Sequence, residues 1–254
     1  MQYVYQTQYF VNLDKNRPMK KRILSGSLAF MLVSVPLMFS GQTKSSGQVA
    51  VKAGDSTSCG KIEYAGQTYH TVIIGSQCWM TENLNVGKYT DVSQEQKPGD
   101  NGVVEKYCFW NDFVQCDFWG GLYEWNEMMA YSQKSGAQGI CPDGWHVPSS
   151  QDWKNLIRFL GMNDEAGGKL KSTLQWTTPN VGATNSSGFS AYPGGYYDTM
   201  THRWIDLNRQ GYYWTSEMIS ATQAVGVNLT FRTSIVEMYD EFQLSALSVR
   251  CIKN

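Results

Sequence analysis

The sequence has few charged residues, which limits the kinds of partner it can bind. Asp, Glu, Lys and Arg make up 17% of the 254 residues, whereas an average soluble protein has about 25%. The net charge is -1, and no long basic run follows the first 41 residues. A nucleic-acid-binding protein needs a basic surface to neutralise phosphates. We therefore expect no nucleic-acid partner.

The usual patterns of metal and thiol sites are also missing. The chain has three histidines, His70, His146 and His202, and no two of them have the spacing of a metal-binding pair. No Cys-x-x-Cys pair occurs, which argues against a zinc ribbon or a thioredoxin-like site. The calcium-loop pattern Asp-x-Asp-x-Asp-Gly is absent. We therefore expect neither a metal nor another cofactor.

One apolar stretch, residues 23–39, follows a short basic segment that begins at Met19. A basic start, an apolar run and small polar residues after it are typical of a signal peptide. The run is short for a permanent membrane span, and a transmembrane anchor is the alternative interpretation. No cysteine lies near residue 40, so a lipid-anchored cysteine is not available there.

These features predict three segments. The 18 residues before Met19 are polar, which is unusual ahead of a signal peptide. We therefore expect Met19 to be the true start, and residues 1–41 to be a non-native extension plus the signal peptide. Residues 42–58 are small and polar and predict a flexible linker. Residues 59–254 then form an exported domain, with no stable membrane span after signal cleavage.

Six cysteines follow the signal peptide, and an even number in an exported chain predicts three disulfides. Their positions are Cys59, Cys78, Cys108, Cys116, Cys141 and Cys251. The first two lie at the outer ends of a small predicted sheet, which can bring them together. The next two are close in sequence and can close a local loop.

Residues 140–161 contain the clearest series of elements. Asp143-Gly144 predicts a turn, and Pro148 limits the segment before it to a short strand. Ser149 or Ser150 can cap a helix that has Asp152 in its first turn. One apolar face of this helix contains Trp153, Leu156, Ile157 and Leu160, and Gly161 ends it. We expect Trp145 and Trp153 to pack on either side of the bend.

The remaining pattern is mainly strands and loops. Strands are predicted at residues 61–64, 68–74, 78–84, 211–216 and 225–231, and a last strand at 247–252 ends at the C-terminus. A first helix is predicted at residues 122–131, and a loop at residues 85–106. Residues 162–188 should be irregular, because Gly167-Gly168 interrupts any helix there. Early helices and late paired strands indicate an α+β fold.

Several motifs occur in a fixed order along residues 60–253. They are Tyr69-x-Thr71-Val72-x-Ile74-Gly75-x-Gln77-Cys78-Trp79-Met80-x-Glu82-Asn83-Leu84, Gly121-Leu122-Tyr123-x-Trp125, Cys141-Pro142-x-Gly144-Trp145-His146-Val147-Pro148-Ser149-x-x-x-Trp153, Gly167-Gly168-Lys169-Leu170-Lys171, Asn185-x-Ser187-Gly188-Phe189-x-Ala191-x-Pro193-Gly194-Gly195-Tyr196, Tyr213-Trp214-Thr215-Ser216 and Ser248-Val249-Arg250-Cys251. Together they resemble the Fibrobacter succinogenes major paralogous domain family. The structural signature residues are Trp79, Trp125, Trp145, His146, Trp153 and Trp214. The resemblance implies an exported or surface domain of Bacteroidota-type and Fibrobacter-type bacteria, without a particular activity.

The layout of the family is also similar to the C-type-lectin-like fold that sulfatase-modifying factors share, which is a fold-level analogy. It implies an α+β fold in which two helices pack on small antiparallel sheets with long loops, stabilised by disulfides. In such a fold the terminal strand lies near the central strand, so the resemblance implies a Cys141–Cys251 disulfide. Closing a loop of about 110 residues would contribute roughly 4–5 kcal/mol. Cys59–Cys78 and Cys108–Cys116 complete the set.

Candidate chemical groups are few. His146 is interpreted as a packed, hydrogen-bonded histidine rather than a catalyst, and Asp152 as a helix cap. Glu82 and Asp112 are possible acids without a visible partner carboxylate. The triplet Trp110-Asn111-Asp112 also occurs in sugar-binding lectins, and we interpret it as coincidence.

Three aromatic residues are candidates for stacking on sugar rings, namely Tyr196, Tyr197 and Trp204. The alternative, which we favour, is that these residues form the core of a loop.

We expect an exported, non-catalytic binding or structural module of the bacterial cell surface. Its location would be extracellular, at the cell surface or in the periplasm. Its partner would be a surface polysaccharide or another protein, held by the loops of residues 85–120 and 162–210. The alternative is an enzyme distantly related to the sulfatase-modifying, formylglycine-generating factors. Those enzymes need a reactive cysteine pair, whereas the cysteines here suit structural disulfides.

Overall fold

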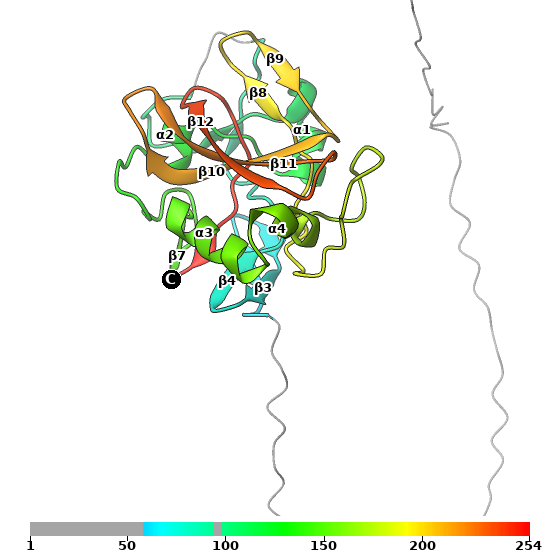
Figure 1. Ribbon diagram of the computed structural model, residues 1–254. Coiled ribbons are helices and arrows are strands. Elements are labelled where there is room, and N and C mark those ends of the chain that lie inside the picture. Colours follow the sequence, from blue (N-terminus) through cyan, green and yellow to red (C-terminus); the bar gives the residue numbers. More distant parts are fainter. Residues whose placement is uncertain (1–57, 94–97) are drawn as a thin grey trace, which may run out of the picture. The chain divides into compact units, whose positions relative to one another are not determined.

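Short strands dominate the fold, because turn residues interrupt the β-branched and aromatic runs every few positions. The computed structural model describes residues 58–93 and 98–254 (Figure 1). The predictions of the start site, the signal peptide and nearly all of the linker lie outside these residues. Within them, small antiparallel sheets and a few helices form an α+β fold, as the sequence predicted.

A four-stranded sheet joins distant parts of the chain. Its strands, in spatial order, are β3 (Thr71–Ile74), β4 (Gln77–Met80), β13 (Ile252–Lys253) and β7 (Trp145–His146). Ile252 pairs with Trp79 on one side and with His146 on the other. The C-terminal strand therefore lies between the two segments with the clearest family motifs. The predicted last strand at 247–252 overlaps β13 only at Ile252, because Leu247 and Ser248 form isolated bridges and not a continuous strand.

A three-stranded sheet is built from β10 (Gln210–Met218), β11 (Gln223–Thr230) and β12 (Val236–Phe242) in sequence order. Figure 1 shows α3 and α4 below this sheet and the β8–β9 hairpin above it. The strands predicted at 211–216 and 225–231 correspond to β10 and β11, whereas β12 was not predicted.

Three two-stranded sheets complete the β-structure. β1 (Ile62–Tyr64) pairs with β2 (Gln67–Tyr69), and β8 (Tyr196–Asp198) pairs with β9 (Arg203–Ile205), both antiparallel. β5 (Lys88–Tyr89) and β6 (Glu105–Lys106) are parallel. The predicted return strand 68–74 is therefore divided between two sheets, and the predicted loop 85–106 contains a short strand pair.

Helix α3 (Ser150–Phe159) agrees with the prediction. The Ser149 side chain accepts a hydrogen bond from the Asp152 backbone amide, and the Asp152 carboxylate accepts one from the Ser149 backbone amide, which completes a capping box. The predicted apolar face is buried, and Gly161 has a φ of 103°. The central helix is thus determined by local sequence.

The other helices differ from the two that were expected, because the described residues contain four. The predicted helix 122–131 is reduced to the single turn α2 (Trp125–Met128). Before it, Leu122 pairs with Tyr107 in a β-bridge, and after it Ala130 adopts a positive φ of 46°. Helix α1 (Phe113–Trp119) follows the 3-10 turn η1 (Phe109–Asn111) inside the predicted cysteine loop.

Helix α4 (Asn163–Leu170) corrects the prediction that Gly167 and Gly168 interrupt any helix. A Cβ on Gly167 would lie 2.5 Å from the Ser234 carbonyl oxygen, and one on Gly168 would lie 2.3 Å from the Gly182 carbonyl oxygen. The two glycines therefore let other backbone segments approach the helix. Tertiary packing here overrides weak helix propensity.

Two large apolar clusters fill the interior. One contains Trp125, Trp145 and Trp214, and the other contains Trp79 and Trp153. Trp145 and Trp153 thus belong to different clusters on the two sides of Pro148. All six cysteines lie in the described residues and form Cys59–Cys78, Cys108–Cys116 and Cys141–Cys251, the expected pairs.

Candidate ligand-binding site

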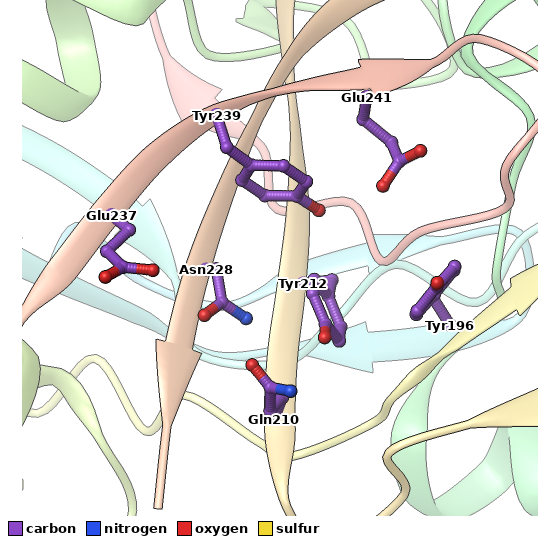
Figure 2. A pocket seen from close by; sticks show the side chains of 7 residues that line it. All are labelled: Tyr196, Gln210, Tyr212, Asn228, Glu237, Tyr239 and Glu241. Atoms are coloured by element: carbon purple, nitrogen blue, oxygen red, sulfur yellow. The ribbon is translucent and has the colours of Figure 1, made fainter. Parts of the chain in front are cut away.

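A pocket lies on the face of the three-stranded sheet away from α3 and α4. Side chains alternate between the two faces of a strand, and the register places Tyr212, Asn228 and Glu237 side by side. The pocket has a volume of about 350 Å³ and is lined by Tyr196, Gln210, Tyr212, Asn228, Glu237, Tyr239 and Glu241. Figure 2 shows these side chains projecting from β8 and the three strands; we call the site the tyrosine pocket.

Three tyrosine rings form a row in this pocket. The ring centroids of Tyr196 and Tyr212 are 4.8 Å apart, and those of Tyr212 and Tyr239 are 6.1 Å apart, both pairs in edge-to-face geometry. Tyr239 lies beside Gly226, where an added Cβ would be 2.9 Å from the ring. The absence of a side chain at this position therefore lets the Tyr239 ring lie across β11.

Two buried polar atoms of the tyrosine pocket have no hydrogen-bond partner among the described residues. They are the Asn228 side-chain nitrogen and the Tyr239 hydroxyl oxygen. Asn228 is 7% exposed, and Figure 2 shows its amide nitrogen directed toward Tyr212. Leaving such a group unpaired costs about 1–3 kcal/mol. The pocket therefore offers hydrogen-bonding groups that a bound molecule can satisfy.

The three phenols remain protonated around neutral pH. Burial, followed by Glu241, raises the pKa of Tyr196 to about 12. Burial also raises the pKa of Tyr212, with Asp206 adding to the effect, and that of Tyr239. The Tyr212 hydroxyl donates to Asp206 at 3.1 Å. The rings therefore present neutral hydroxyl groups rather than phenolates.

Glu237 and Glu241 are the charged members of the pocket lining. Four residues of extended strand separate their Cα atoms by about 13 Å, and Tyr239 lies between them (Figure 2). Aromatic faces, amide and phenol donors and carboxylate acceptors are the groups that hold a hydroxyl-rich ligand.

Of the three aromatic residues proposed from sequence, only Tyr196 lines this pocket. Tyr197 is 3% exposed, and its ring stacks on Trp204 at 4.2 Å. It also contacts Tyr107 at 5.1 Å. Tyr197 and Trp204 therefore form a loop core, and most of the pocket comes from the sheet rather than from the loops of residues 85–120 and 162–210.

His146 occupies a structural position. Its Nδ1 lies 2.6 Å from Asn254 Oδ1, and its Nε2 lies 3.4 Å from Asp152 Oδ2. The hydrogen bond to Asp152 raises the His146 pKa, although burial opposes the shift. The five signature tryptophans are buried, at 0–5% exposure. These residues are arranged for packing.

The triplet at residues 110–112 has local roles. Asn111 accepts a hydrogen bond from the Val92 amide, and Asp112 caps helix α1. Trp110 in η1 and Phe113 and Phe118 in α1 are 61–65% exposed, so exposed aromatic side chains also lie on these two helices. Within residues 58–93 and 98–254, no cluster of His, Cys, Asp and Glu is suited to hold a metal ion. No helix in this part combines the length and apolarity needed to cross a membrane.

Comparison with known proteins identifies the family of the chain. No curated protein and no solved structure matches it. The model of the Fibrobacter succinogenes major domain matches residues 72–253, which include the signature tryptophans of both large apolar clusters and the whole tyrosine pocket. The chain therefore belongs to the Fibrobacter succinogenes major domain family.

Proposed function

We propose that this chain is an exported, non-catalytic module that binds a polysaccharide of the bacterial surface in the tyrosine pocket. The proposal includes a C-type-lectin-like fold for residues 59–254, preceded by a signal peptide and a linker. Its disulfides are compatible with an exported protein. The alternative, a sulfatase-modifying type of enzyme, has less support, because all six cysteines are in disulfides and none is free.

The observation that carries the proposal is the pair of unpartnered polar atoms on Asn228 and Tyr239. Both face a pocket whose tyrosine rings can contact the apolar face of a sugar. Sugar hydroxyls can accept hydrogen bonds from the amide and phenol groups and donate to the carboxylates. A hydroxyl-rich ligand therefore satisfies groups that the fold leaves unpaired.

The test combines a glycan array with the variant Tyr239→Phe. The Tyr239 hydroxyl has no partner among the described residues, so its removal should leave the melting temperature unchanged or raised. Glycan binding should weaken about tenfold, since one hydrogen bond contributes roughly 0.5–1.5 kcal/mol. Tyr131→Phe is the matched control, because this variant removes a hydroxyl that bonds to Glu127 outside the pocket.

Two results would contradict the proposal. One is that the purified protein, with its disulfides intact, binds no glycan on the array. The other is that Tyr239→Phe binds every glycan as tightly as the unmodified protein does.

A further inference from the structure

We infer that the tyrosine pocket selects its ligand by charge. It takes neutral or amine-bearing sugar residues and excludes uronic-acid and sulfated residues, with Glu237 and Glu241 as the specificity-determining side chains. This inference rests on the proposed function, because it names the class of glycan that the same site accepts.

The charged side chains that line the pocket have one sign. The lining contains two carboxylates and no Lys or Arg. A third carboxylate, Asp206, accepts hydrogen bonds from the Tyr212 hydroxyl and the Gln210 side-chain amide, so it lies directly behind the lining. An anionic sugar would therefore meet acidic groups and no cation in the lining.

The β8–β9 hairpin contributes one nearby pair of opposite charges. Asp198 raises and Arg203 lowers the pKa of Tyr196, so both act on the edge of the pocket. Arg203 is exposed and is not part of the lining. Because it is accompanied by Asp198, it does not reverse the negative charge of the pocket.

The positions of the two glutamates suit this role. Figure 2 shows Glu237 and Glu241 on opposite sides of the Tyr239 ring. A sugar residue that contacts the Tyr239 ring therefore lies near at least one of these carboxylates, whichever way the sugar is oriented. Each carboxylate can accept a hydrogen bond from a hydroxyl or an ammonium group, and each repels a carboxylate or a sulfate.

The neutral donors of the pocket do not offset this repulsion. Asn228 and Tyr239 can donate to any oxygen, including that of a uronate. However, a hydrogen bond from a neutral donor also forms with a sugar hydroxyl, so it gives a uronate little advantage. Like charges in a partly desolvated pocket weaken binding on the order of tenfold per carboxylate.

A glycan array that contains cello-, xylo- and manno-oligosaccharides, glucosamine oligomers, galacturonate oligomers and sulfated galactans tests the inference. Binding that is sensitive to Tyr239→Phe should be confined to the neutral and glucosamine probes. If such binding includes galacturonate or sulfated probes with comparable affinity, the charge inference is wrong while the proposed function stands. If no probe of any class binds, the proposed function itself fails.

The double variant Glu237→Gln/Glu241→Gln tests the assignment of the two residues. Calorimetry should show the preference for the neutral over the galacturonate oligomer falling about a hundredfold, tenfold for each charge removed. Asp240→Asn is the matched control, because it removes a charge from the same strand but at a position that alternates to the other face. An unchanged preference in the double variant, or an equal change in the control, overturns the assignment.

Salt provides a second measurement that needs no variant. Charge repulsion over several ångströms is screened strongly at about 1 M salt, where the Debye length is about 3 Å. In the unmodified protein, galacturonate binding should therefore strengthen between 0.15 M and 1 M sodium chloride relative to neutral binding. A preference that does not change with salt contradicts an electrostatic origin.

Discussion

Lys171 has no exposed surface, yet its charge has a complete set of partners. Its ammonium group donates to the carbonyl oxygens of Val181, Thr230 and Thr233 at 2.8–2.9 Å. Burial lowers the Lys171 pKa to about 8, so the group is largely protonated at neutral pH. This lysine links three loop and strand carbonyls, of which that of Val181 also accepts a hydrogen bond from Ser234 Oγ. It contrasts with Asn228, whose amide is buried without a partner.

We expect Lys171→Met to destabilise the protein by about 2–4 kcal/mol, because the variant leaves buried carbonyls unpaired. Urea unfolding of the oxidised protein measures this loss. Lys154→Met is the control, since Lys154 is an exposed lysine on α3. Equal stability of the two variants would show that the carbonyls find other donors.

His146 should make stability depend on pH. Its pKa in the folded protein is raised above 6.5, first by the hydrogen bond with Asp152. A raised pKa means that the folded state binds the proton more tightly than the unfolded chain. The contribution is therefore complete below about pH 6.5 and is lost as the pH rises through the folded pKa.

The variant His146→Gln should remove this contribution. Thermal melting at a series of pH values should show the unmodified protein losing stability above pH 6.5 faster than the variant does. The stabilities of the two proteins should differ most below pH 6.5 and above the pKa of Asp152, because His146 is then protonated while Asp152 is ionised. Parallel curves would mean that the His146–Asp152 contact does not stabilise the fold.

Sequence reasoning was most successful for residues whose role is local. A cap at Ser149 or Ser150 with Asp152 in the first turn could be predicted because these residues lie within one helical turn, where the structure forms a capping box between Ser149 and Asp152. Asn228 and Tyr239 were missed because they meet only through the pairing of β11 with β12. The one local indication was a polar Asn228 between Val227 and Leu229, which does not by itself distinguish a site from an exposed position.

At the level of elements, α4 depends on backbone contacts that only glycine allows. We expect Gly168→Ala to destabilise the protein by about 1–3 kcal/mol, because the new methyl would lie 2.3 Å from the Gly182 carbonyl oxygen. This result would oppose helix propensity, which favours alanine by about 1 kcal/mol. Gly99→Ala is the control, since nothing lies within 4 Å of its added Cβ. A stabilised Gly168→Ala protein would contradict the packing argument.

The difference between local contacts and contacts between residues distant in sequence explains which elements could be predicted. Helix α3 has a cap, an apolar face and a terminating glycine within one stretch. Helix α1 has Asp112 as its cap and Gly120 at its end, but its exposed aromatic residues hide the apolar periodicity. The predicted helix 122–131 was too long, since it contains α2, but Leu122 and Tyr123 before α2 pair with Tyr107 and Leu247, which are distant in sequence.

At the level of the whole molecule, the disulfides differ in how much chain they join. Cys108–Cys116 spans 8 residues, whereas Cys141–Cys251 spans 110. The longer one links the segment before β7 to the segment before β13, and these two strands are adjacent in the four-stranded sheet. The pairing could be expected only through the resemblance to a known layout, because the residues between the two cysteines do not determine it.

Removing the long disulfide should therefore cost more stability than removing the short one. In the chain-entropy model, Cys141→Ala/Cys251→Ala should lose about 4–5 kcal/mol, and Cys108→Ala/Cys116→Ala about 2–3 kcal/mol. Guanidinium unfolding without reductant measures both losses. Because β13 contributes only Ile252 and Lys253 to the sheet, it has few hydrogen bonds with which to hold its place once the disulfide is gone. Equal losses from the two pairs would show that local packing, rather than closure of the long loop, holds the C-terminal strand between β4 and β7.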